Sequence, residues 1–118
     1  IHPTAVIGTN VFIQDGTVVM PRVVINANSE VGRHVILNTA SVVEHDNVIN
    51  DYVHLSPGAT LCGAVEVGAK SHIGANATVI QGISIGEHCI IGAGSTVIDH
   101  IPQSSVAVGS PAKVIKKV

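Results

Sequence analysis

The stretch LCGAVEVGAKSHIGANATV (residues 61–79) places an aliphatic side chain at every sixth position. The same period runs without a slip from Ile1 to Val97. Apolar residues on one face of a helix recur every 3.6 residues, and those on one face of a strand every 2, so neither element explains the period. A fixed six-residue period is typical of a hexapeptide β-helix, in which each coil stacks on the previous one. We therefore expect an all-β solenoid.

The third and fourth positions of the repeat, counted from its aliphatic residue, have the composition of a turn. Proline recurs at the third position, and Gly, Asn or Asp recur at the fourth (Pro3, Pro21, Pro57; Gly16, Gly58, Gly82, Gly94, Asn10, Asn28, Asn76, Asp46). A type II turn needs positive φ at its second central residue, which these fourth-position residues tolerate. The fifth position is mostly small or β-branched, which suits a narrow interior, and the sixth is expected to face outward. Each six residues should therefore contain one short strand and one turn.

Three repeats per triangular coil is the known geometry of hexapeptide β-helices, and the spacing of the prolines agrees with it. Pro3 and Pro21 are 18 residues apart, which agrees with three repeats per triangular coil and gives five to six coils in total. The repeats stop at Pro102, so we expect a β-helix domain at residues 1–101 and a capping tail at residues 102–118. Ile1 begins in full register without a cap. We interpret this as a domain whose upstream partner is absent.

Composition excludes several classes of function. The chain is 46% hydrophobic but only 2% aromatic, so its core must be built from aliphatic ladders. A net charge of −2 indicates neither a nucleic-acid surface nor a basic membrane-binding face, and no apolar run reaches membrane-spanning length. Cys62 and Cys89 lie one and a half coils apart, so no disulfide is expected, which favours a cytoplasmic location.

Two kinds of motif carry a resemblance to a known family. The hexapeptide repeats and the segment VGSPAK (residues 108–113) resemble the acyltransferase superfamily that uses acetyl-CoA. The segments LNTASVVEHD (residues 37–46) and YVHLSPG (residues 52–58) resemble, more specifically, the branch that acetylates bacterial amino sugars and sialic acids. This resemblance implies a left-handed parallel β-helix and a homotrimer with acetyl-CoA in a groove between neighbouring prisms. It also implies an N-terminal α/β domain that holds the nucleotide sugar.

The resemblance also assigns roles to particular residues. It implies that His45 is the general base and that Asp46, where relatives commonly carry Glu, assists it. Asn38, His54 and the backbone amide of Gly63 match the residues that line the thioester end of the cofactor. These assignments predict direct attack of the acceptor on the thioester.

The chemistry of histidine supports the assignment of His45 independently. A base must remove a proton from the attacking amine or hydroxyl, and histidine suits this work near neutral pH. His45 and Asp46 occupy the third and fourth positions, hence an exposed corner, with Gly63 one coil above and Ala27 one coil below. These small neighbours are expected to leave open space for the imidazole. The alternative interpretation is a solvated turn histidine.

Other candidate residues have weaker patterns. His54 and His72 are 18 residues apart on one outward face, but no third histidine has the spacing of the zinc carbonic anhydrases of this fold. We therefore expect no metal, and a surface or interface role for His72. Cys62 is interpreted as packing rather than as a nucleophile, because nothing in the pattern activates it. Lys113 in the tail is a candidate contact for the CoA phosphates, with a solvated lysine as the alternative.

The positions of two histidines predict an oligomer. His45 and His54 are half a coil apart, so a single site containing both would require two chains. This favours an obligate trimer with three inter-subunit sites, and the outward apolar column Val6, Val24 and Val42 is a candidate part of its interface.

The predicted function is acetyl-CoA-dependent transfer of an acetyl group to an amino group of a bacterial nucleotide-linked sugar. One alternative is O-acetylation of sialic acid or a related sugar hydroxyl. The other is a non-catalytic β-helix scaffold, because solenoids also serve as assembly modules.

Overall fold

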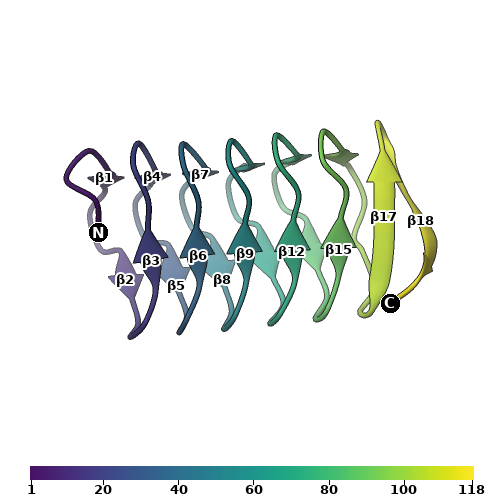
Figure 1. Ribbon diagram of the computed structural model, residues 1–118, viewed down its shortest axis with the longest axis horizontal. Coiled ribbons are helices and arrows are strands. Elements are labelled where there is room, and N and C mark those ends of the chain that lie inside the picture. The colour runs from purple at the N-terminus through teal and green to yellow at the C-terminus, as the bar shows by residue number, and fades with distance from the viewer.

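The computed structural model describes residues 1–118 as a single elongated prism of 38 × 22 × 20 Å. It contains strands and turns but no helix, so no helical segment is available to cross a membrane. Figure 1 shows the coils stacked side by side, from the first coil at the N-terminus to a hairpin at the C-terminus. The all-β prediction is confirmed.

Sixteen strands of two residues each form the coils. They are β1 (Val6–Ile7), β2 (Phe12–Ile13), β3 (Val18–Val19), β4 (Val24–Ile25), β5 (Glu30–Val31), β6 (Ile36–Leu37), β7 (Val42–Val43), β8 (Val48–Ile49), β9 (His54–Leu55), β10 (Thr60–Leu61), β11 (Glu66–Val67), β12 (His72–Ile73), β13 (Thr78–Val79), β14 (Ser84–Ile85), β15 (Ile90–Ile91) and β16 (Thr96–Val97). Each strand consists of the sixth position of one repeat and the first position of the next.

Three parallel sheets form the sides of the prism. The first has the order β1-β4-β7-β10-β13-β16, the second contains β2, β5, β8, β11 and β14, and the third begins β3-β6-β9-β12-β15. Every pairing within a coil stack joins residues 18 apart, as in Val6 with Val24 and His54 with His72. Sixteen strands at three per coil give between five and six coils, as predicted. The architecture is that of the left-handed parallel β-helix.

The turns between strands have the predicted conformation. Every fourth position from Asn10 to Gly94 has positive φ, including bulky residues such as Tyr52 (φ 61°) and Arg22 (φ 62°). An L-residue in this region costs roughly 1–2 kcal/mol, which Gly avoids and Asn or Asp partly offset. The regular coil therefore imposes the turn even where the residue type disfavours it.

The core consists of aliphatic ladders. First-position side chains such as Ile25, Val43 and Leu61 are completely buried, and fifth-position residues such as Val53 and Ala59 fill the remaining interior. Each buried Val, Leu or Ile contributes about 1.5–3 kcal/mol of transfer free energy. The sixth position faces outward, as predicted.

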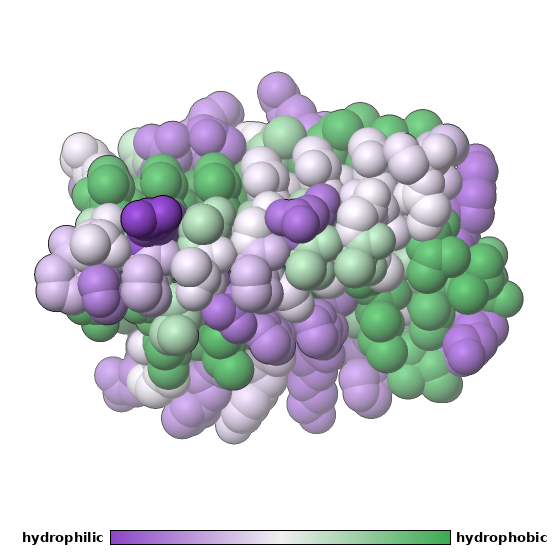
Figure 2. Space-filling model, turned by 45° about the horizontal axis from the view of Figure 1, so that its top comes forward, coloured by the Kyte–Doolittle hydropathy of each residue, from purple (hydrophilic) through white to green (hydrophobic).

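The last residues extend the third sheet. After Pro102, β17 (Ser105–Gly109) pairs in parallel with β15, and β18 (Ala112–Lys117) returns antiparallel to β17. Exposed apolar side chains gather at this end, on the right in Figure 2: Val108, Val114, Ile115 and Val118. Lys113 is exposed on β18.

Candidate active site

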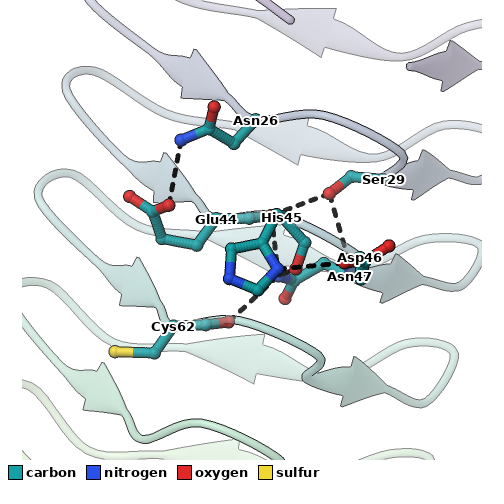
Figure 3. Close-up of polar contacts among 7 residues, drawn as sticks. All are labelled: Asn26, Ser29, Glu44, His45, Asp46, Asn47 and Cys62. Carbon is teal, nitrogen blue, oxygen red and sulfur yellow. Dashed lines mark hydrogen bonds and ion pairs between the residues drawn. The ribbon is translucent and has the colours of Figure 1, made fainter. Parts of the chain in front are cut away.

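His45 and Asp46 form the turn that joins β7 of the first sheet to β8 of the second (Figure 3). Asp46 occupies the fourth position with φ 58°, a conformation that Asp adopts more readily than most residues. Backbone hydrogen bonds hold this turn between its neighbours: the Asp46 N–H donates to the Ala27 carbonyl, and the Ala64 N–H donates to the His45 carbonyl. The two side chains therefore project from a convex corner of a fixed scaffold.

The imidazole and the carboxylate of this turn are in direct contact. Nδ1 of His45 lies 3.0 Å from Oδ2 of Asp46, and both side chains are about half exposed (54% and 56%). A carboxylate only accepts hydrogen bonds, so this contact favours the tautomer with its proton on Nδ1. The other nitrogen, Nε2, then carries a free lone pair. Although Asp is shorter than Glu, it reaches the ring from the adjacent position.

Gly63 supplies the space that the imidazole occupies. A Cβ added to Gly63 would stand 2.6 Å from Nε2 of His45, with its three nearest neighbours all in that ring. The structure agrees with the expectation that a small residue one coil above leaves space for the imidazole, and the ring occupies that space. The N–H of Gly63 makes no hydrogen bond within the chain.

Polar residues that the sequence did not single out support this corner. Nδ2 of Asn47, which is buried, donates to the carbonyls of Glu44 (2.8 Å), His45 (3.2 Å) and Cys62 (3.0 Å). On the outer side, Nδ2 of Asn26 donates to Oε2 of Glu44 at 2.9 Å. Figure 3 shows these groups around the turn. The detectable signal was Asn47 itself, an amide at a repeat position that is otherwise small or aliphatic.

A second polar group lies on the third sheet. Nδ2 of Asn38 is 3.3 Å from Nε2 of His54, while Oδ1 of Asn38 accepts from the Thr39 N–H. The rings of His54 and His72 are stacked with centroids 4.6 Å apart, and Nε2 of His72 lies 2.6 Å from Oγ of Ser56. Burial lowers the pKa of His54 below the ordinary value, and the charge of nearby His72 lowers it further.

The structure thus divides the predicted site residues into two groups. His45, Asp46 and Gly63 meet at the corner between the first and second sheets, whereas Asn38 and His54 meet on the third sheet, opposite that corner. Lys113 lies apart from both, at the C-terminal end. The single chain has no pocket, and no group of three or more His, Cys, Asp or Glu side chains is arranged to hold a metal ion. Both cysteines are free thiols, Cys62 half-buried and Cys89 buried.

Comparison with known proteins finds relatives with this fold. The family described as "Bacterial transferase hexapeptide (six repeats)" matches residues 64–99. GDP-perosamine N-acetyltransferase from Escherichia coli is 38% identical over 66 residues, which are 56% of this chain and 30% of that protein. The alignment therefore spans less than a third of this curated relative.

Solved structures match nearly the whole chain. A histidine-to-asparagine mutant of perosamine N-acetyltransferase from Caulobacter crescentus, in complex with CoA and GDP-perosamine, superposes with a TM-score of 0.96 at 41% identity. That match covers 99% of this chain and 56% of the other. The acetyltransferase domain of PglB from Neisseria gonorrhoeae, in complex with acetyl coenzyme A, superposes with a TM-score of 0.95 at 38% identity. That match covers 97% of this chain and 56% of the other.

The fold and the corner site define a hexapeptide-repeat β-helix protein with an exposed histidine–carboxylate pair. The chain is similar to hexapeptide-repeat transferases, and the relatives that match it at 38–41% identity are sugar acetyltransferases. It spans just over half the length of the solved relatives.

Proposed function

We propose that this chain is the catalytic β-helix of an acetyl-CoA-dependent N-acetyltransferase that acts on an amino group of a nucleotide-linked sugar. The observation that carries the proposal is the corner geometry, in which Asp46 holds Nδ1 of His45 and leaves Nε2 beside Gly63. The relatives that bind CoA and GDP-perosamine, or acetyl coenzyme A, support the choice of donor and acceptor.

In this mechanism His45 moves one proton. The neutral amine of the acceptor attacks the acetyl carbonyl carbon while Nε2 of His45 takes a proton from the attacking nitrogen. The tetrahedral intermediate then collapses, the carbon–sulfur bond breaks, and the departing CoA thiolate accepts the proton from the imidazolium. Asp46 stabilises the imidazolium formed between these steps. A positioned base contributes about 10²–10⁴-fold to the rate of such reactions.

The free N–H of Gly63 has the chemistry of an oxyanion donor. It lies next to the imidazole and has no partner in the chain, so it is available to the thioester carbonyl oxygen. Negative charge develops on this oxygen as the amine attacks. In acyl-transfer enzymes, removing one such donor costs about 10²–10³ in turnover.

A complete site requires a second chain in this proposal. The corner that carries His45 is convex, and His54 lies on the opposite side of the prism. We therefore propose a homotrimer in which Asn38 and His54 of one protomer face His45 of its neighbour, with acetyl-CoA in the groove between them. The column Val6, Val24 and Val42 is in register along the first sheet and would contribute to the interface. Lys113 would contact the CoA phosphates, and the free thiols fit a cytoplasmic enzyme.

The test measures CoA release with acetyl-CoA and GDP-perosamine as substrates, and in parallel with sialic acid as the acceptor. His45→Ala should lower turnover about 10²–10⁴-fold while leaving acetyl-CoA binding, measured by calorimetry, intact. His88→Asn is the matched control, because His88 is also a turn histidine and Asn tolerates its positive φ. If acetyl transfer occurred only to sialic acid, the acceptor group would be a hydroxyl rather than the proposed amine. Acetyl-CoA binding without transfer to either acceptor would contradict the proposed activity.

A further inference from the structure

Asn47 is an exception in the interior of the β-helix. It occupies the fifth position of its repeat, where every other residue is Ala, Val, Ile, Cys, Ser or Thr. Its side chain is completely buried, and its Oδ1 has no hydrogen-bond partner. A buried amide oxygen without a partner destabilises a fold. Packing alone therefore does not account for an amide at this position.

Three of the hydroxyl residues at the fifth position make a hydrogen bond between coils, whereas the buried hydroxyl of Ser41 has no partner. Thr17, Ser29 and Ser71 each donate Oγ–H to a carbonyl 15 residues further along, which links one coil to the next. Asn47 makes the same link to the Cys62 carbonyl at 3.0 Å. It also donates to the carbonyls of Glu44 and His45 within its own turn, which no fifth-position hydroxyl does. Among the fifth-position residues only Asn47 makes two such bonds within its turn; the Cys89 thiol makes a single, longer contact of this kind, 3.6 Å to the Glu87 carbonyl.

The Cys62 carbonyl belongs to the same peptide unit as the N–H of Gly63. Because a trans peptide is planar, its carbonyl and its N–H point in opposite directions. By holding the Cys62 carbonyl toward the interior, Asn47 directs the Gly63 N–H outward, in the residue whose added Cβ would meet the His45 ring. Hydrogen bonds at the two ends of one peptide also reinforce each other.

We propose that Asn47 is a positioning residue that fixes two groups at once: the backbone of the base His45 and the peptide that supplies the Gly63 N–H. The proposal rests on the proposed acetyl transfer for its kinetic consequence, but not for its structural one. One buried amide thus holds together two coils that would otherwise set the distance between base and oxyanion donor independently. Misplacement of a catalytic group by about 1 Å costs roughly 10²-fold in rate.

Two substitutions separate the links that Asn47 makes. Asn47→Ser should keep the bond to Cys62, as Ser29 and Ser71 keep theirs, and lose the bonds within the turn. Asn47→Val, which matches Val65 one coil further on, loses all three. We expect turnover to fall about 10-fold in the Ser variant and about 100-fold in the Val variant, with the KM for acetyl-CoA changed less than about 2-fold. Ser71→Ala, which removes a coil link far from His45, is the control for a purely structural effect.

Measurements made without substrate test the positioning role of Asn47 separately from the proposed acetyl transfer. Nitrogen-15 NMR of the imidazole should show one His45 tautomer, protonated at Nδ1, in the parent chain and in Ser71→Ala, and a tautomer mixture in Asn47→Val. Faster hydrogen exchange of the Ala64 amide, which donates to the His45 carbonyl, should accompany it. If the parent chain shows no acetyl transfer, the proposed function fails while these spectra still decide the role of Asn47. Unchanged spectra in Asn47→Val, or equal turnover losses in Ser71→Ala and Asn47→Val, would overturn the positioning role.

Discussion

Gly63 and His45 lie in adjacent coils, and the imidazole of His45 occupies the space that a side chain at residue 63 would fill. A Cβ at residue 63 would stand 2.6 Å from Nε2 of His45. The backbone of Gly63 lies outside the left-handed region, so the glycine is needed for space rather than for conformation. The N–H of the same residue makes no hydrogen bond within the chain. Base and candidate oxyanion donor are therefore placed by a single contact between coils.

This contact predicts the effect of Gly63→Ala. The added methyl group should displace the imidazole and lower turnover about 10²-fold, because the base moves by about 1 Å. The fold should be retained, since no other atom is among the three nearest to the new Cβ. Steady-state kinetics and a thermal melt measure the two effects. In a His45→Ala background the same substitution should cost nothing further, and a second full loss there would refute a clash with the ring.

The contact between His45 and Asp46 predicts a loss of activity in Asp46→Asn. Asn tolerates the positive φ of this position, so the turn should form normally. The amide no longer stabilises an imidazolium, and turnover should fall by about 10-fold or more. The melting temperature should change little, because exposed ion pairs contribute about 0–1 kcal/mol. Asp46→Glu is the control, with most activity retained. Full activity in Asp46→Asn would remove Asp46 from the mechanism.

Much of the fold followed from the sequence because each repeat carries its own information. The aliphatic first position predicted the buried ladders, and Gly, Asn and Asp at the fourth position predicted the positive φ that all fourth positions from Asn10 to Gly94 adopt. The contact of His45 with Asp46 joins sequence neighbours and was equally accessible. Such local patterns need no knowledge of how side chains meet between coils.

The remaining contacts of the candidate site join side chains of neighbouring coils. The six-residue repeat alone does not indicate which of these side chains form hydrogen bonds. Asn47 reaches the carbonyl of Cys62, 15 residues further on, and Asn38 reaches His54 across 16 residues. Side chains at those offsets are neighbours in every coil, but only rotamers and hydrogen-bond partners decide which of them touch. The space at Gly63 is an exception, because the 18-residue spacing already placed this glycine one coil above His45.

The stacked histidines of the third sheet predict a pH-dependent stability. Burial lowers the pKa of His54 below the ordinary histidine value of 6.5, and the charge of His72 adds to the shift. The unfolded chain therefore binds a proton on this residue at a higher pH than the folded chain does. The contribution of His54 to the free energy of unfolding should be complete above pH 6.5 and be lost as the pH falls through its folded pKa.

The substitution His72→Asn tests the smaller cause of the lowered His54 pKa, which is the charge of His72. The pKa of His54, measured by NMR titration, should rise toward 6.5 but remain below it, because burial persists. His34→Asn is the matched control, since His34 is stacked on Tyr52 in a different corner of the prism. An unchanged His54 pKa in His72→Asn would mean that the stacked ring exerts no electrostatic effect.

The turn conformation predicts opposite effects of the same substitution at two alanines. Ala40 has φ 59°, where Cβ is unfavourable, so Ala40→Gly should stabilise the chain by up to about 1 kcal/mol. Ala27 lies at a third position and is absent from the residues with positive φ, so Ala27→Gly should destabilise by a similar amount. Urea denaturation measures both. Equal signs for the two variants would contradict the turn geometry.

The division of the candidate site between two sides of the prism predicts complementation between inactive variants. If His45 of one protomer works with His54 of its neighbour, then His45→Ala and His54→Ala chains should restore one another when co-assembled. In a random one-to-one mixture about one quarter of the sites combine both intact histidines, so activity should approach about a quarter of the parent value. A mixture of His45→Ala with Gly63→Ala should stay inactive, because both changes affect the same corner. No recovery in the first mixture, with trimers confirmed by sedimentation, would place each site within a single chain and exclude His54 from the chemistry at His45.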